Sequence, residues 1–111
     1  MTALELEFHQ EMLAGSAILK TQHGYNPTYF LQMVGAHGGV GAVHRLLEAA
    51  DFQSGLTSLW EIHRLDLSCE TAVLNPKYAS LFTSAEKKEA RRRLAAMNYT
   101  PQFGAAPPEI L

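Results

Sequence analysis

The same four-residue signal stands near both ends of the chain, and it is the feature that most constrains the fold. Thr2 with Glu5, and Thr83 with Glu86, have the spacing of a capping box. In a capping box, a threonine hydroxyl and a glutamate carboxylate bind the open backbone N–H groups of a helix start. Each box precedes apolar residues that recur at three- and four-residue steps. The chain is therefore predicted to begin and to end its folded part with a helix.

Between these two helices, the sequence predicts several shorter ones. Gly24 and the glycine pair at 38–39 can stop a helix, and the Asn-Pro pairs at 26–27 and 75–76 also mark helix boundaries. No segment alternates convincingly between apolar and polar residues, as a strand would. Helices are expected over about 2–22, 40–50, 67–74 and 84–97. A further helix, capped by Asn26, is expected to end at Gly38, and another is expected to begin at Ser54 or Thr57. A short helical turn is expected within 76–82.

The predicted fold is all-α, a compact irregular bundle of about six or seven short helices. A single helical domain is expected over 1–99, and a proline- and glycine-containing tail, 100–111, is expected to be loosely ordered. The residues expected to face the core are Leu4, Phe8, Met12, Leu13, Ile18 and Leu19 on the first helix, and Ala90, Leu94 and Met97 on the last.

The composition is that of an ordinary globular protein, with 47% apolar and 18% charged residues. The single cysteine cannot form an internal disulfide, and the start "MTALELEFHQ" does not resemble a secretory leader. No run of about 18 apolar residues is present. We therefore expect a cytoplasmic protein without a membrane span, and no cofactor is predicted.

The stretch "EIHRLDLSCE" at 61–70 gathers residue types found in active sites and metal centres. His63, Asp66, Cys69 and Glu70 can all bind zinc, and a cysteine near a histidine can act as a nucleophile. The spacing contains neither C-x-x-C nor H-E-x-x-H, and a lone cysteine between apolar neighbours is typical of a buried side chain. A small enzyme or metal protein centred here is one hypothesis, but no catalytic or metal-binding residue is predicted.

The same stretch can also be interpreted as a structural corner between two helices. Asp66 is expected to be the N-cap of helix 67–74, a contribution of about 1 kcal/mol. Glu70 would lie in the first turn, where a negative charge favours the positive end of the helix dipole. Arg64 is positioned to pair with either carboxylate. The predicted corner therefore consists of Arg64, Asp66 and Glu70.

The segment "EKKEARRR" at 86–93 carries a net charge of +3 in a chain whose formal net charge is −2. Such a segment can contact nucleic-acid phosphates. A solvated charged face is the commoner meaning, because Glu89 can pair with arginines three and four residues later. A nucleic-acid-associated accessory protein is thus a second hypothesis. Its candidate contact residues are Lys87, Lys88, Arg91, Arg92 and Arg93.

The remaining hypothesis, and the one favoured by the sequence, is a non-enzymatic helical module that docks on a partner protein or on itself. It rests on a good helical core that is not accompanied by a catalytic constellation. Aromatic side chains dominate the energetics of protein interfaces. The candidate contact residues are Tyr25, Tyr29, Trp60, Tyr78 and Phe82.

A longer combination of motifs runs through about 5–99. It comprises Y-N-x-x-x-F-L-x-M, a glycine pair, R-L-L, L-W-E, R-L-D-L-[ST]-x-E and L-F-T-x-x-E-x-x-x-A-R-x-R-L. This combination resembles a family of small bacterial all-helical domains of uncharacterised function. Because we associate such modules with the ends of larger bacterial proteins, some of them nuclease-like, the resemblance implies a modest link to DNA by analogy. It implies no reaction or ligand. The chain departs from the pattern at Ser68 and Cys69, where threonine and an apolar residue are typical.

Overall fold

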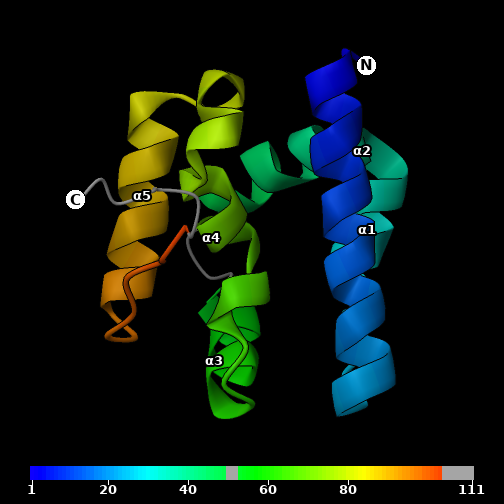
Figure 1. Ribbon diagram of the computed structural model, residues 1–111, viewed down its shortest axis with the longest axis vertical. Coiled ribbons are helices and arrows are strands. Elements are labelled where there is room, and N and C mark those ends of the chain that lie inside the picture. Colours follow the sequence, from blue (N-terminus) through cyan, green and yellow to red (C-terminus); the bar gives the residue numbers. More distant parts are fainter. Residues whose placement is uncertain (50–52, 104–111) are drawn as a thin grey trace, which may run out of the picture.

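The computed structural model describes residues 1–49 and 53–103, which form helices joined by short turns (Figure 1). The all-α prediction is confirmed, and these residues contain no strand. Residues 50–52 and most of the predicted tail, 104–111, lie outside the described residues. The elements are α1 (Ala3–His23), α2 (Thr28–Glu48), α3 (Gln53–Glu61), the 3-10 turn η1 (Leu65–Leu67), α4 (Cys69–Leu74), the 3-10 turn η2 (Pro76–Leu81) and α5 (Ser84–Ala95).

Both predicted capping boxes are present. The backbone N–H of Glu5 donates to the Thr2 hydroxyl at 3.1 Å, and the Thr2 N–H donates to the Glu5 carboxylate at 2.7 Å. Thr83 and Glu86 make the same two bonds at the start of α5, at 3.1 and 2.9 Å. Gly24 ends α1 in the left-handed conformation, with φ of 64°. Both ends of α1 and the start of α5 were therefore readable from local sequence.

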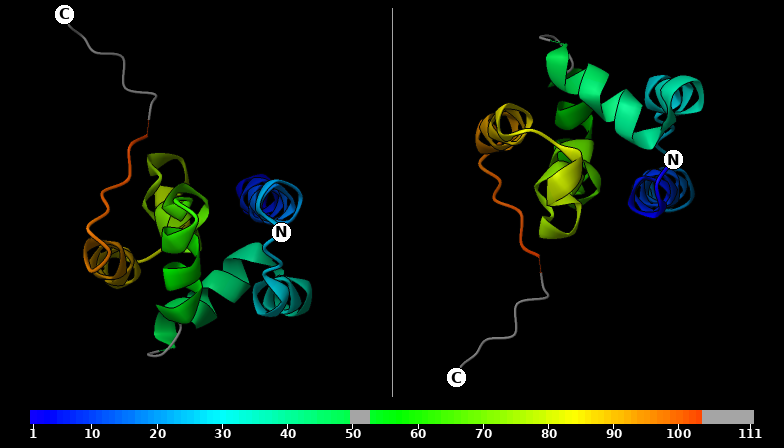
Figure 2. Two further views of the ribbon diagram at one scale, coloured as in Figure 1. Left: turned by 90° about the horizontal axis from the view of Figure 1, so that it is seen from below. Right: turned by 90° about the horizontal axis from the view of Figure 1, so that it is seen from above.

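Helix α2 is broken where the glycine pair predicted a break. Gly38 has φ of 76° and ψ of 166°, values that interrupt the helix and change its direction (Figure 2). The expected N-cap at its start is wrong. Pro27 occupies the N-cap position instead of Asn26, and no side chain caps this helix.

The helices form a layered arrangement with α4 near the middle. Helix α1 and the first half of α2 lie side by side at one edge, and α5 lies at the opposite edge (Figures 1 and 2). The second half of α2 crosses from the α1 side toward α5. No helix within 1–49 or 53–103 combines the length and the apolar character needed to cross a bilayer.

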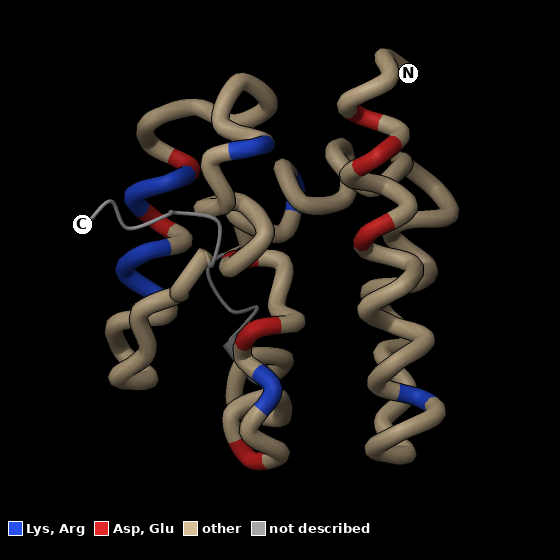
Figure 3. Tube along the Cα trace, in the orientation of Figure 1, with Lys and Arg blue, Asp and Glu red and all other residues tan. Residues whose placement is uncertain are grey.

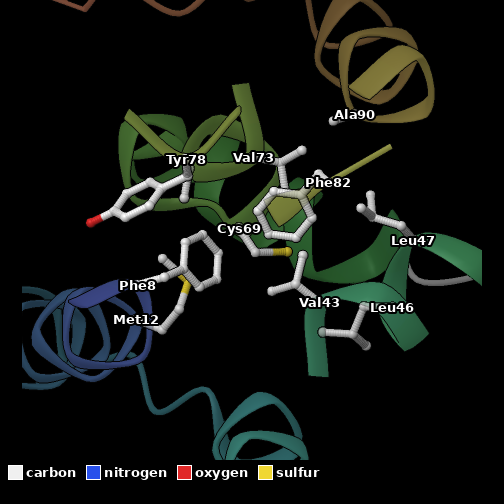
Figure 4. Packing of buried hydrophobic residues seen from close by; sticks show 11 residues of the cluster. Phe8, Met12, Val43, Leu46, Leu47, Cys69, Val73, Tyr78, Phe82 and Ala90 are labelled. Atoms are coloured by element: carbon white, nitrogen blue, oxygen red, sulfur yellow. The ribbon is translucent and has the colours of Figure 1, made fainter. Parts of the chain in front are cut away.

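The main core gathers side chains from all of these layers (Figure 4). The Phe8 ring of α1 packs edge-on against Tyr78, with ring centroids 5.0 Å apart, and lies 5.2 Å from the Phe82 ring. Tyr78 is fully buried and Phe82 is 6% exposed. The prediction that these two aromatic residues contact a partner is therefore wrong, because Phe8 of α1 covers both of them.

The predicted core face of α1 needs one correction. Phe8, Met12 and Leu19 are buried, but Leu13 is 41% exposed. Leu13 follows Met12 by one residue, a rotation of about 100° around an α-helix, which carries it out of the buried arc. Ser16, four residues after Met12, is buried in its place. A second apolar cluster joins Leu19 to Leu56, Leu59, Leu65 and Leu94.

Candidate functional site

The corner at 61–70 is built differently from the prediction. Asp66 is not the N-cap of α4. Ser68 is, and its hydroxyl accepts the Thr71 N–H at 3.1 Å. The reason is the 3-10 turn η1, which delays the start of α4 to Cys69. The Asp66 carboxylate accepts two hydrogen bonds from the Arg64 guanidinium instead, both at 3.1 Å. This pair raises the pKa of Arg64, mainly through those bonds.

Glu70 does not pair with Arg64, because its partner is Arg93 of α5. Their side chains are both 1% exposed, and the Arg93 Nη1 donates to the Glu70 carboxylate at 3.2 Å. The prediction that Arg93 contacts nucleic acid is therefore wrong. Position 93 lies three residues after Ala90, which is close to one helical turn, so it shares the inward direction of that buried residue.

The Arg93 guanidinium uses all five of its N–H donors, so its burial leaves no donor open. Two bind carboxylates, from Glu70 and from Glu89 of the same helix. The other three bind backbone carbonyls in the last turn of α2, where a helix terminus leaves carbonyls short of intrahelical partners. These carbonyls belong to Leu46, Leu47 and Ala49, at 3.1, 3.1 and 2.8 Å. Arg93 thereby caps α2 and joins it to α4 and α5.

Cys69 lies in the core beside this ion pair. The residue is 6% exposed, and its thiol donates to the Glu70 carboxylate at 3.3 Å. Burial and the neighbouring Glu70 raise the pKa of Cys69 well above its ordinary value. A thiol that stays protonated is a poor nucleophile and a poor metal ligand. His63 is exposed on a turn, and no group of three potential metal ligands occurs within the described residues.

We expect native Cys69 to resist modification by Ellman's reagent. The buried thiol should react only as fast as the domain opens, whereas the same protein in concentrated urea should react at once. Absorbance of the released thiolate follows both reactions. Complete modification of the folded protein within seconds would contradict the buried position of this cysteine.

The basic residues of α5 alternate along the helix with its glutamates (Figure 3). Arg93 is buried, and Arg92 binds Glu89 at 2.7 and 2.8 Å. These two arginines, Arg92 foremost, lower the pKa of Glu89 to about 2. The pairing that the sequence predicted is thus present. It contributes stability above the ordinary glutamate pKa of 4.5, and this contribution is lost as the pH falls toward 2.

The uncompensated charge of α5 is smaller than the sequence suggested. Lys88 and Arg91 are exposed and Lys87 is half-buried. In the described part of the chain, none of these three cations takes part in an ion pair. The basic face predicted from five residues therefore consists of three.

An apolar groove lies between α1, the start of α2 and α3. Its deepest part is a hollow of about 60 Å³, which opens beside a wider, shallower one of about 550 Å³. The two share Tyr25, Pro27, Phe30 and Gly55. The apolar side chains that line the deep part include Met12, Leu19, Tyr25, Phe30, Leu56, Leu59 and Leu67. Tyr29, which is 59% exposed, lines the shallow part.

The few polar groups on the floor of the groove are already satisfied. The Ser16 hydroxyl donates to the Met12 carbonyl at 3.0 Å, and the Ser68 hydroxyl donates to Thr71 at 3.0 Å. Glu70 is neutralised by Arg93. No buried side-chain polar atom lacks a hydrogen-bond partner in the described residues. The groove therefore offers an apolar and electrically neutral surface.

The structure separates the aromatic residues that the sequence grouped together. Tyr25 and Tyr29 line the groove, whereas Tyr78 and Phe82 belong to the core. Trp60, 52% exposed, lies in a different hollow of about 280 Å³ beside His63 and Tyr99. Sequence reasoning missed the aliphatic wall of the groove, although Leu56 and Leu59 were visible as part of a predicted helix.

Comparison with protein-family models, with curated proteins and with solved structures finds no match. The family resemblance noted in the sequence therefore stays a prediction.

Proposed function

We propose that the chain is a non-enzymatic interaction module whose groove receives an aliphatic side chain from a partner polypeptide. The observation that supports this most is the groove itself. It joins a narrow apolar hollow to the wider, shallower hollow lined by the exposed Tyr29, which we call the shelf. Amphipathic segments commonly bind in this way, with apolar anchors in a hydrophobic groove.

The chemistry of the groove restricts what can enter it. A hollow of about 60 Å³ is too small for a large ligand but has room for one branched aliphatic group. Because Ser16, Ser68 and Glu70 already have hydrogen-bond partners, a polar or charged group would lose its water without gaining a new partner there. The inserted group is therefore apolar, and the contacts that fix its orientation come from the shelf around Tyr29.

The groove supports a function better than the basic face of α5 does. Lys87, Lys88 and Arg91 alone would give modest, salt-sensitive attraction to any polyanion. Surface charges of this kind are common on proteins, whereas an apolar hollow that is open to solvent is typical of a binding site.

Isobutanol, which carries the leucine side chain, tests the groove directly. In NMR titrations, the methyl signals of Leu19, Leu56 and Leu59 should shift, since these residues line the hollow. The substitution Ser16→Leu places an aliphatic group in the hollow from within the chain, and it should abolish those shifts while the domain stays folded. Equal shifts in the wild type and in Ser16→Leu would exclude the groove as the binding site.

A selection from displayed helical peptides extends the test to polypeptides. Selected peptides should share one aliphatic anchor, and their affinity should fall about tenfold for Tyr29→Ala, a hot-spot loss of about 1–2 kcal/mol. Trp60→Ala is the matched control, because it removes a similarly exposed aromatic side chain outside the groove. If both variants lose affinity equally, the proposed site is wrong.

A further inference from the structure

The outward face of α1 carries large apolar side chains that nothing in the described chain covers. Five large apolar residues are exposed within the described residues, and two of them are Leu6 and Leu13 of this helix, at 44% and 41%. They are separated by seven residues, which is about two helical turns, so they point in the same direction. Helix α1 stands at the edge of the molecule in every view (Figures 1 and 2).

The face around these two leucines is free of charge. The stripe, defined as Ala3, Leu6, Gln10, Leu13, Ala14 and Ala17, is exposed at each of its positions. Most of its members follow one another at alternating three- and four-residue steps, the spacing of a helix–helix seam. On the other side of the same helix, the side chains of Phe8, Met12 and Leu19 are buried in the core. A helix that is apolar on both sides is typically covered on both sides.

We propose that this stripe is a two-fold interface with a second copy of the chain, in which the two α1 helices pack antiparallel. An isologous contact needs a surface that complements itself. With the two-fold axis between Gln10 and Leu13, Leu6 of one copy faces Ala17 of the other, and Leu13 faces Gln10. Leu6 then meets a small side chain, which lets the helices approach closely there.

The charges at the border of the stripe are compatible with this pairing. In an antiparallel two-fold contact, each border meets the same border of the other copy, so carboxylates on it would repel each other. Glu7 lies on this border and is paired with Lys77 of η2. Glu11 lies farther from the stripe than Glu7, and its carboxylate accepts a hydrogen bond from the Tyr78 hydroxyl at 2.7 Å. Both carboxylates are therefore occupied within their own chain, and the repulsion between copies is small.

The size of the stripe sets the strength of the dimer. In this register the two helices overlap from Ala3 to Lys20, a length of roughly 27 Å at 1.5 Å per residue. Two helices packed over this length bury roughly 900 Å² in total, at the lower limit for a specific interface. We therefore expect a dimer that forms at micromolar concentrations and dissociates on dilution.

Sedimentation velocity over a concentration series tests this interface. The wild type should shift from monomer to dimer as concentration rises, and Leu6→Glu and Leu13→Glu should stay monomeric at every concentration. Both leucines are exposed, so these variants keep the fold. Gln32→Glu, which adds the same charge at an exposed position of α2, should dimerise as the wild type does. A wild type that is monomeric throughout, or a dimer that survives Leu13→Glu, would overturn the proposal.

A spin label at Gln22→Cys tests the direction of the pairing. In the antiparallel arrangement, the two labels lie roughly 30 Å apart along the helix axes, at 1.5 Å per residue. A distance below about 20 Å would indicate parallel helices and contradict the two-fold arrangement. Because Tyr29 lies outside the stripe, Tyr29→Ala should dimerise normally even if it abolishes peptide binding. The proposal of peptide binding in the groove and the proposal of dimerisation through the stripe can therefore be contradicted independently.

Discussion

Replacing Arg93 by alanine is expected to destabilise the domain by about 3–5 kcal/mol, the usual cost of breaking a buried ion pair from one side. The substitution leaves the Glu70 carboxylate, 1% exposed, without its positive partner. It also removes the hydrogen bonds that the guanidinium donates to the carbonyls of Leu46, Leu47 and Ala49 at the end of α2. Domains are typically stable by only about 5–15 kcal/mol, so a large fraction of the variant should be unfolded under mild conditions. Urea unfolding followed by circular dichroism measures the loss.

Arg92→Ala is the matched control, because it removes the neighbouring arginine from the exposed side of the same helix. Its ion pair with Glu89 lies on the surface, where such pairs are worth about 0–1 kcal/mol. Arg93→Lys should fall between the two variants, since a lysine keeps the charge but cannot make five hydrogen bonds in the fixed geometry of a guanidinium. If Arg93→Ala and Arg92→Ala lost the same small amount of stability, the buried network would not hold these helices together.

The elements of this fold that were predictable are those fixed by neighbours in the sequence. A capping box such as Thr83 with Glu86 depends on a spacing of three residues, and the break at Gly38 depends on the conformational freedom of one residue. Spacing along a helix also placed Glu89 against its arginines. Such signals do not require knowledge of what packs against the helix.

The parts that were not predictable depend on contacts between distant segments. Arg93 looked like one more surface cation, because the sequence does not reveal that the end of α2, more than forty residues earlier, presents backbone carbonyls to it. Tyr78 looked like a contact residue because only the fold brings Phe8 against it. The available signal for Arg93 was its position three residues after Ala90, on a face already predicted to be buried.

The buried network also bears on the groove. Glu70 and Cys69 form part of the groove floor, and Arg93 neutralises that floor from the opposite side. The same guanidinium that holds α5 against α2 thus keeps the groove electrically neutral. Stability and the proposed binding chemistry are coupled at this one residue. Groove binding should therefore be tested with Ser16 and Tyr29 variants, and not with changes at Arg93.

A second large loss of stability is expected for Gly39→Ala. Gly39 lies immediately after the break in α2, where this helix crosses α1, and its N–H donates to the His9 Nδ1 at 2.9 Å. A Cβ atom on Gly39 would lie 2.7 Å from the His9 Cα and 3.2 Å from its Cβ. Those atoms belong to the backbone region of α1 and cannot rotate away, so the two helices must separate. Forcing extra volume into such a contact costs about 1–3 kcal/mol, and the hydrogen bond to His9 would be lost as well.

Gly35→Ala makes this prediction specific to the helix crossing. Gly35 lies in the first half of the same helix, and a Cβ atom there would meet nothing within 4 Å. Alanine at an open helical position should stabilise the domain by about 0.5–1 kcal/mol, because it restricts the unfolded chain. The two Gly→Ala variants should therefore move the urea midpoint in opposite directions. Equal midpoints would mean that α1 and α2 do not approach as closely at His9 as the structure places them.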